Sequence, residues 1–296
     1  MDSVAKPKLD FMIIGVQKCS TSWLWRMLEQ HPAMDLSNKK EIHYFGGVEN
    51  YRKGNDWYYR HFADVDPAKL NGEASTSYFA REIPFWYDDS PQAQTDPSLA
   101  SIPELILEQF PDIKVIIVMR DPVRRAVSAY QHLVRRRDPQ VSPLRSLRHV
   151  AEAWPRKRLI EYGTYLPTIR FWQQFIPPER MHFMVFEEDV LETPDESLRK
   201  VFEFLDVDPD VDVENPGKKY NLRWSWTRTV LNYYAGSMAP LLRRPRVAGL
   251  VDSVDLLKRF EVSQADAVYL REQFLPEKPE LEAILERSLD CWKYAI

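Results

Sequence analysis

The main pattern along this chain is a short, unbroken apolar run followed by a segment with helical periodicity. The first run covers residues 11–16 (FMIIGV), a composition typical of a strand buried on both faces of a sheet. A polar loop follows, and then an amphipathic segment with Trp23 and Met27 at apolar positions, which ends at His31-Pro32. The pattern predicts a β-strand, a loop and an α-helix in direct succession.

The same succession returns twice further along the chain. Residues 114–119 (KVIIVM) read as a strand, and Pro122 stands where the first turn of a helix accepts proline. Residues 180–189 (RMHFMVFEED) predict a third strand, and residues 195–207 (DESLRKVFEFLDV) an amphipathic helix. Strands that alternate with helices pair in parallel. We therefore expect a three-layer α/β fold, in which helices flank both faces of a mainly parallel central sheet.

The length of 296 residues suits one large α/β domain, and no internal repeat divides it. Residues 84–101 and 138–146 are rich in residues that favour turns and predict surface loops. Residues 271–292 predict a closing pair of helices. We expect a single domain over residues 1–296.

Composition and charge exclude several classes of function. The net charge of −4 gives no overall attraction to nucleic acid, and 44% hydrophobic residues suit a globular enzyme. Cys19 and Cys291 lie at opposite ends of the chain, which suggests neither a disulfide framework nor a zinc site. No apolar run reaches the roughly 20 residues of a membrane span, and the N-terminus has no signal-peptide pattern. We expect a cytoplasmic protein.

Candidate chemistry begins in the loop after the first strand, residues 15–23 (GVQKCSTSW). A loop that enters a helix presents unpaired backbone N–H groups and the positive end of the helix dipole, which suit an anion such as phosphate. Lys18 adds a positive charge, and Ser20, Thr21 and Ser22 add hydroxyl donors. Alternatively, the hydroxyl residues simply cap the helix. The loop is not a Walker A motif, because no glycine directly precedes the lysine.

This loop resembles the phosphosulfate-binding loop of sulfotransferases that use 3′-phosphoadenosine 5′-phosphosulfate (PAPS). The resemblance implies that Trp23 stacks near the adenine, and that the donor is bound by Lys18, Cys19, Ser20, Thr21 and Ser22. Members of the family often have glycine in place of Ser20, which allows the closest approach of the backbone to phosphate.

A second segment, VIIVMRDPVRRAVSAY, resembles the motif that binds the 3′-phosphate in this family. It implies that Arg120, at the end of a strand, and Ser128, two helical turns later, hold this phosphate. A guanidinium group binds phosphate with two parallel hydrogen bonds, which agrees with that role. The alternative for Arg120 is an ordinary ion pair.

A third segment, residues 39–62, resembles the region of heparan-sulfate-type sulfotransferases that carries the catalytic glutamate, and the match falls on Glu41. This carboxylate is expected to act as the general base toward the acceptor. His43 is expected to assist; in a strand it would point to the opposite face, but in a loop it can line the same cleft. Alternatively, Glu41 pairs with Lys39 or Lys40 at the surface, and His43 packs among neighbouring aromatic rings.

A fourth segment, residues 215–226 (NPGKKYNLRWSW), resembles the late loop that closes over the nucleotide, but it also reads as a solvated turn. The resemblance assigns nucleotide contacts to Lys218, Lys219 and Tyr220. The chain departs from the family at two other places. Ala74 stands where carbohydrate enzymes commonly have a lysine near the sulfuryl group, and Phe186 stands where cytosolic members usually have tyrosine.

Together the segments are similar to those of PAPS-dependent sulfotransferases, with a motif pattern nearest to heparan-sulfate-type and bacterial stand-alone enzymes. The resemblance implies a P-loop NTPase-like fold and transfer of a sulfuryl group from PAPS, with PAP as product and no metal. Lys18 would stabilise the leaving group, and the acceptor would be a hydroxyl or amine of a small molecule, glycan or carrier-bound group. Neither the acceptor nor the oligomeric state follows from the sequence.

Two other functions stay open at this point. A P-loop kinase would share the sheet and require Mg²⁺. A non-catalytic protein that binds a polyanion would use residues 120–148, which contain eight arginines.

Overall fold

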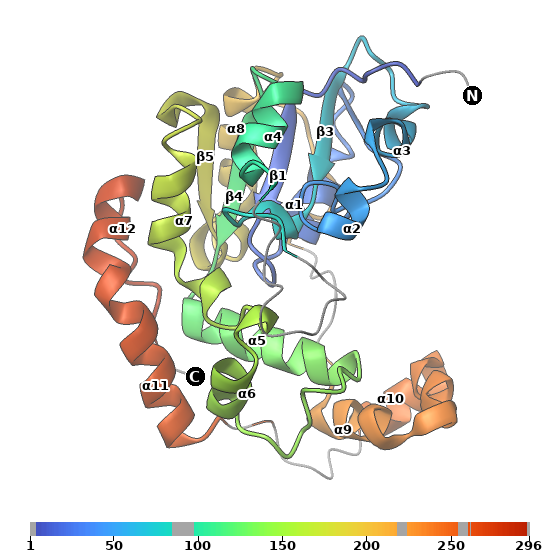
Figure 1. Cartoon of the computed structure of the whole chain (residues 1–296), viewed down its shortest axis with the longest axis vertical. Helices are drawn as coiled ribbons and strands as arrows, with labels where there is room; N and C mark the ends of the chain where they lie inside the picture. The colour runs from blue at the N-terminus through green and yellow to red at the C-terminus, as the bar shows by residue number, and fades with distance from the viewer. Residues whose placement is uncertain (1–3, 85–97, 218–223, 254–259, 261, 295–296) are drawn as a thin grey trace. The chain divides into compact units, whose positions relative to one another are not determined.

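The computed structural model describes residues 4–84, 98–217, 224–253, 260 and 262–294. Its backbone groups into two compact units, and each unit is built from two separate stretches of chain. Unit 1 comprises Met1–Arg120 and Tyr165–Tyr220, and unit 2 comprises Asp121–Thr164 and Asn221–Ile296. Figure 1 shows the chain and labels most of its helices and strands.

Unit 1 contains a five-stranded sheet with the strand order β2-β3-β1-β4-β5. Every neighbouring pair of strands is parallel, so their carboxyl ends share one edge of the sheet. The parallel sheet expected from the sequence is confirmed. The strands are β1 (Phe11–Gly15), β2 (Met34–Leu36), β3 (Leu70–Ala74), β4 (Lys114–Met119) and β5 (Met181–Val185).

The central strand β1 forms the middle of the core. Phe11, Met12, Ile13 and Ile14 are all fully buried, as the unbroken apolar run predicts. Phe11 pairs with Gly72 on β3, and the ring of Phe11 occupies the space that a side chain at Gly72 would need.

Helices flank this sheet, and in Figure 1 α4 and α7 pass in front of the strands while α8 passes behind them. Helix α4 begins with a capping box between Ser101 and Glu104, which satisfies backbone N–H groups of its first turn. The helices of unit 1 are α1 (Thr21–Leu28), α2 (Val48–Tyr51), α3 (Asn55–Tyr59), α4 (Ile102–Gln109), α7 (Tyr165–Trp172) and α8 (Pro194–Phe204).

Unit 2 is helical in its described residues. Helix α5 begins at Pro122 as expected, and the Asp121 carboxylate caps it by accepting the Val123 and Arg124 N–H groups at 2.9 and 3.1 Å. The other oxygen of Asp121 accepts the Tyr294 N–H at 3.0 Å. The helices are α5 (Pro122–Arg135), α6 (Leu147–Ala153), α9 (Trp226–Tyr234), α10 (Pro245–Ser253), α11 (Gln264–Phe274) and α12 (Lys278–Leu285).

The third predicted strand was too long at its carboxyl end. Strand β5 stops at Val185, and Phe186–Val190 form a π-helical turn. The Asp189 carboxylate folds back to accept the Val185 N–H at 2.5 Å, and Ser197 donates to its other oxygen at 3.2 Å. These bonds favour a turn over continued pairing in the sheet.

Two further expectations concern the surface and the membrane. In the described part of the chain, no helix combines the length and the hydrophobicity that crossing a membrane requires. Residues 138–146 form turns, as expected, whereas residues 85–97 of the predicted 84–101 loop lie outside the described residues.

Candidate active site

The loop between β1 and α1 has an unusual backbone. Lys18 and Ser20 have φ angles of 72° and 69°, the left-handed conformation that favours glycine. Two hydrogen bonds hold the loop, from the Val16 N–H to the Val118 carbonyl at 2.9 Å and from the Cys19 N–H to the Val16 carbonyl at 3.2 Å. Cys19 is fully buried, with its sulfur 4.0 Å from the Tyr165 hydroxyl. The loop is therefore anchored to β4 and to α7.

The hydroxyl groups of this loop do not behave as ordinary helix caps. Ser20 is the N-cap residue of α1, yet its side chain makes no capping hydrogen bond. Thr21, the first residue of α1, accepts a hydrogen bond from the Lys40 ammonium group at 3.4 Å. Ser22 is half-buried. The capping alternative therefore does not account for Ser20.

Arg120 follows β4 and lies beside this loop. Its guanidinium group donates to the Lys18 carbonyl at 3.4 Å and stacks over the Phe186 ring, with 4.8 Å to the ring centre. Its Nε lies 3.9 Å from Glu187, so the ion pair is long. Phe186 thus packs against Arg120, and the fold brings together the first two segments found in the sequence.

The structure describes only some of the other residues that were predicted to bind the nucleotide. Ser128 lies on α5 in unit 2 and is half-buried there. Trp23 is buried, and its indole N–H donates to the Pro216 carbonyl at 2.7 Å. Pro216 shortly precedes Lys218, Lys219 and Tyr220, which lie outside the described residues. The roles of all these residues in nucleotide binding stay predictions.

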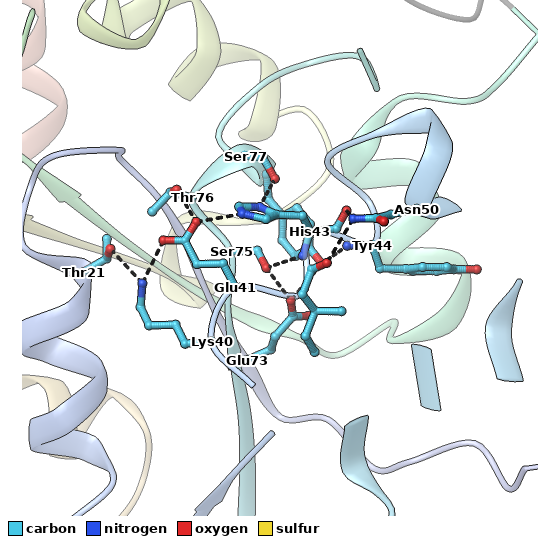
Figure 2. A network of polar contacts seen from close by, with 12 residues as sticks. Thr21, Lys40, Glu41, His43, Tyr44, Asn50, Glu73, Ser75, Thr76 and Ser77 are labelled. Carbon is cyan, nitrogen blue, oxygen red and sulfur yellow. Dashed lines mark hydrogen bonds and ion pairs between the residues drawn. The ribbon is translucent and has the colours of Figure 1, made fainter. Parts of the chain in front are cut away.

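Glu41 lies in the loop between β2 and α2, where three side chains converge on its carboxylate (Figure 2). Lys40 Nζ lies 2.9 Å from Oε1. Thr76 Oγ1 donates to Oε2 at 2.8 Å, and His43 Nε2 lies 3.0 Å from the same oxygen. Burial disfavours the charged form of Glu41, but the His43 hydrogen bond and the positive charges of Lys40 and His43 outweigh it. Together they hold the pKa of Glu41 well below its usual range.

His43 lies beside Glu41 because its backbone takes a left-handed turn, with φ at 58°. The His43 N–H donates to Ser75 Oγ at 2.9 Å, and Nδ1 lies 2.8 Å from Ser77 Oγ. The loop arrangement foreseen for His43 is therefore the observed one, and its ring is held by polar partners. Lys40 does pair with Glu41, but only 14% of its side chain is exposed, so this is not a pair at the open surface.

The sequence analysis did not predict the buried carboxylate and its hydroxyl partners that lie behind this loop. Glu73, at the end of β3, is fully buried and accepts hydroxyl groups from Tyr58, Ser75 and Tyr78 at 2.6, 2.6 and 2.8 Å. Burial raises the pKa of Glu73, and the three hydrogen bonds oppose that shift. The available signal was a carboxylate within the buried strand segment Leu70–Ala74.

This group supports the backbone of the Glu41 loop. Ser75 Oγ accepts the His43 N–H while it donates to Glu73, and Tyr78 OH accepts the Tyr44 N–H at 3.0 Å while it also donates to Glu73. Ala74 is buried beside Glu73 and offers no cation at that position.

The arrangement suits proton transfer next to the β1–α1 loop. Glu41 is an ionised carboxylate with ordered donors, and Lys40 connects it to Thr21 at the start of α1. Among the residues that the structure describes, no group of three or more His, Cys, Asp or Glu side chains could hold a metal ion.

Comparison with known proteins identifies the family of this chain. The model of the sulfotransferase domain matches residues 8–225. Heparan sulfate glucosamine 3-O-sulfotransferase 5 of Mus musculus is 27% identical over 223 residues, which cover 73% of this chain and 57% of that protein. The bifunctional heparan sulfate N-deacetylase/N-sulfotransferase 1 of Caenorhabditis elegans is 26% identical over 230 residues, which cover 72% of this chain and 24% of that protein. The chain therefore spans less than two thirds of these relatives.

A solved structure extends the similarity to the whole chain. The crystal structure of a sulfotransferase from Alicyclobacillus acidocaldarius aligns with a TM-score of 0.64 and 24% sequence identity. The alignment covers 98% of this chain and 100% of the other. The two proteins share a fold.

Proposed function

Because the chain belongs to the sulfotransferase domain family, we propose that it transfers a sulfuryl group from PAPS to a hydroxyl or amine of an acceptor. The acceptor oxygen or nitrogen forms a bond to sulfur as the bond from sulfur to the bridging phosphate oxygen breaks. The electron pair of the broken bond stays on the phosphate of PAP. Glu41 takes the proton of the acceptor.

One observation carries this proposal. Lys40 Nζ lies 2.9 Å from Glu41 Oε1 and 3.4 Å from Thr21 Oγ1, so a single side chain joins the carboxylate to the β1–α1 loop. In-line transfer requires a base on one side of the sulfur and a site for the leaving phosphate on the other. Glu41 and the β1–α1 loop supply these two elements.

The loop residues provide electrostatic stabilisation in this proposal. Lys18 and the first N–H groups of α1 stabilise negative charge on the departing phosphate oxygen. Arg120, which contacts the Lys18 carbonyl, binds the 3′-phosphate together with Ser128. Trp23, Lys218, Lys219 and Tyr220 complete the nucleotide contacts. His43 orients Glu41 through the contact at 3.0 Å.

A glycan is the acceptor class that the names of the relatives support, since both name heparan sulfate. Ala74 distinguishes this chain from the pattern noted in carbohydrate enzymes, so small molecules and carrier-bound groups belong in the same test.

The test is an assay of the purified protein with sulfur-labelled PAPS and a panel of acceptors from these three classes. We expect labelled product and an equal amount of PAP. Tighter binding of ATP with Mg²⁺ than of PAP, without sulfated product, would favour a kinase and contradict the proposal.

Two substitutions separate the role of Glu41 in catalysis from the role of Arg120 in nucleotide binding. Glu41→Gln should lower kcat at least 100-fold and leave PAP affinity within about twofold, because general-base catalysis typically contributes 10²–10⁴-fold. Arg120→Ala should weaken PAP binding at least tenfold. Glu29→Gln and Arg26→Ala, at exposed positions of the α1 region, are matched controls. Loss of PAP binding in Glu41→Gln with normal binding in Arg120→Ala would contradict the assignment.

A further inference from the structure

We propose that Lys40 is a further catalytic residue, a cation that contacts both Glu41 and the sulfuryl group of the bound donor. This role rests on the function proposed above. It is distinct from the role of Lys18, which belongs to the leaving phosphate on the other side of the sulfur.

The position of Lys40 is the first argument. Its ammonium group bridges a charged oxygen, Glu41 Oε1, and a neutral hydroxyl, Thr21 Oγ1 (Figure 2). Only 14% of the side chain is exposed. A partly desolvated cation between a carboxylate and an anion-binding loop interacts more strongly with charge than a solvated lysine does.

The second argument is reach. Thr21 is the first residue of α1, where the N–H groups that suit an anion lie. A donor held there brings its sulfuryl oxygens close to Thr21, and Lys40 Nζ is already 3.4 Å from the Thr21 hydroxyl. An ammonium group has three N–H donors, and the contacts found among the described residues use two of them.

The third argument concerns the strength of the base. Glu41 is faced by Lys40 and His43 from its own loop and by the Thr76 hydroxyl from the turn after β3. Behind the loop, Glu73 accepts a hydrogen bond from Ser75, which in turn accepts the His43 N–H. Thr76 and His43 hold Oε2, so Lys40 is the partner of Oε1.

When Lys40 is attracted toward the sulfuryl group, its interaction with Glu41 Oε1 becomes weaker. The pKa of Glu41 then moves up from its lowered value, because the positive charge of Lys40 is one of the causes of that lowering. Glu41 becomes a stronger proton acceptor when the donor is in place. The same cation therefore links donor binding to activation of the acceptor.

The test compares the affinities for PAPS and PAP without acceptor, because PAP lacks the sulfuryl group. Lys40→Met should weaken PAPS binding at least tenfold and change PAP binding less than twofold, with kcat at least 100-fold lower. Lys40→Arg, which keeps the charge, should retain most of the PAPS affinity. The exposed neighbour substitution Lys39→Met is the matched control and should change neither affinity.

Two results would overturn this role. One is that the wild-type protein binds both nucleotides, but Lys40→Met either loses PAPS and PAP affinity equally or keeps its PAPS affinity unchanged. This result would leave the proposed function intact. The other is failure of the wild-type protein to bind either nucleotide, which would remove the proposed function as well. If Lys40→Met does not fold, Lys40→Arg provides the comparison of PAPS and PAP affinities with the wild-type protein.

Discussion

Ser20 occupies a backbone conformation that its side chain disfavours. A non-glycine residue in the left-handed region costs about 1–2 kcal/mol, and Lys18, two positions earlier, carries the same type of cost. The surrounding strand and helix hold both residues in place. Strain of this kind is typical of sites where the backbone must approach a ligand.

Replacement of Ser20 by glycine should therefore stabilise the protein. We expect Ser20→Gly to raise the free energy of unfolding by about 0.5–1 kcal/mol, since glycine enters the left-handed region without a Cβ clash. Ser22→Gly makes the same chemical change within α1 and should lower stability by about 0.5 kcal/mol. Urea denaturation of the two variants measures this. Equal effects of the same sign would contradict the explanation.

Glu41 should contribute to stability in a pH-dependent way. Its pKa is lower in the folded state than the value of 4.5 that describes it in the unfolded chain. The unfolded state therefore binds more protons as pH falls, and the stability that Glu41 contributes above pH 4.5 is progressively lost on acidification.

Comparison with Glu41→Gln isolates this contribution. Between pH 5 and pH 3.5, the difference in unfolding free energy between wild type and variant should shrink by roughly 1 kcal/mol. This interval lies below the range in which histidines ordinarily titrate. Urea denaturation at both pH values provides the measurement, and a difference that is constant or grows on acidification would contradict the lowered pKa.

The end of β3 and the Glu41 loop are joined by hydroxyl groups that both donate and accept. Tyr78 is the clearest case, because it donates to Glu73 and accepts the Tyr44 N–H. Loss of this hydroxyl leaves a buried carboxylate oxygen and a buried N–H each short of one partner. The loss of these hydrogen bonds destabilises the loop that carries Glu41.

Tyr78→Phe should lower the free energy of unfolding by about 2–3 kcal/mol, and it should reduce kcat while PAP affinity stays nearly constant. Tyr59→Phe is the matched control. The Tyr59 hydroxyl donates to Gln109 at 3.2 Å, and its loss should cost about 1 kcal/mol or less. Denaturation and steady-state kinetics give both quantities. A parallel loss of PAP affinity in Tyr78→Phe would argue against a local effect on the loop.

The elements that sequence reasoning found are those whose pattern is local. Strands β1 and β4 are unbroken apolar runs, and α5 has its proline and its capping aspartate in adjacent positions. The carboxyl ends of parallel strands share one edge, and the structure places Arg120 against the Lys18 carbonyl at this edge.

The details that it missed depend on hydrogen bonds made by particular side chains. The early end of β5 depends on where the Asp189 side chain finds a donor. The partners of Glu41 come from two segments: Lys40 and His43 lie in its own loop, and Thr76 lies 35 positions away. Propensity and periodicity carry no information about such side-chain hydrogen bonds. The sequence pointed to Glu41, Lys40 and His43, but not to Thr76.

The two compact units are interwoven in sequence. The chain leaves unit 1 after Arg120, returns at Tyr165 and leaves again after Tyr220, so neither unit is one continuous stretch. A unit whose two stretches are separated by the other unit is poorly suited to fold on its own during synthesis. A single domain over residues 1–296 stays a prediction.

Unfolding should accordingly be one cooperative event. In scanning calorimetry we expect a single transition whose calorimetric and van't Hoff enthalpies agree, as cooperative domains show. Circular dichroism and tryptophan fluorescence should give the same midpoint. Two separate transitions would mean that the units unfold independently and would contradict the single-domain expectation.

The central place of β1 has a consequence for biosynthesis. Its neighbours β3 and β4 lie about 60 and 100 residues further along the chain, so this fully buried strand is made well before either partner. At roughly 5–20 residues per second, β1 waits about 5–20 s for β4. During that interval an apolar strand with unpaired edges is exposed, which makes the nascent chain a natural client for chaperones that shield hydrophobic segments near the ribosome.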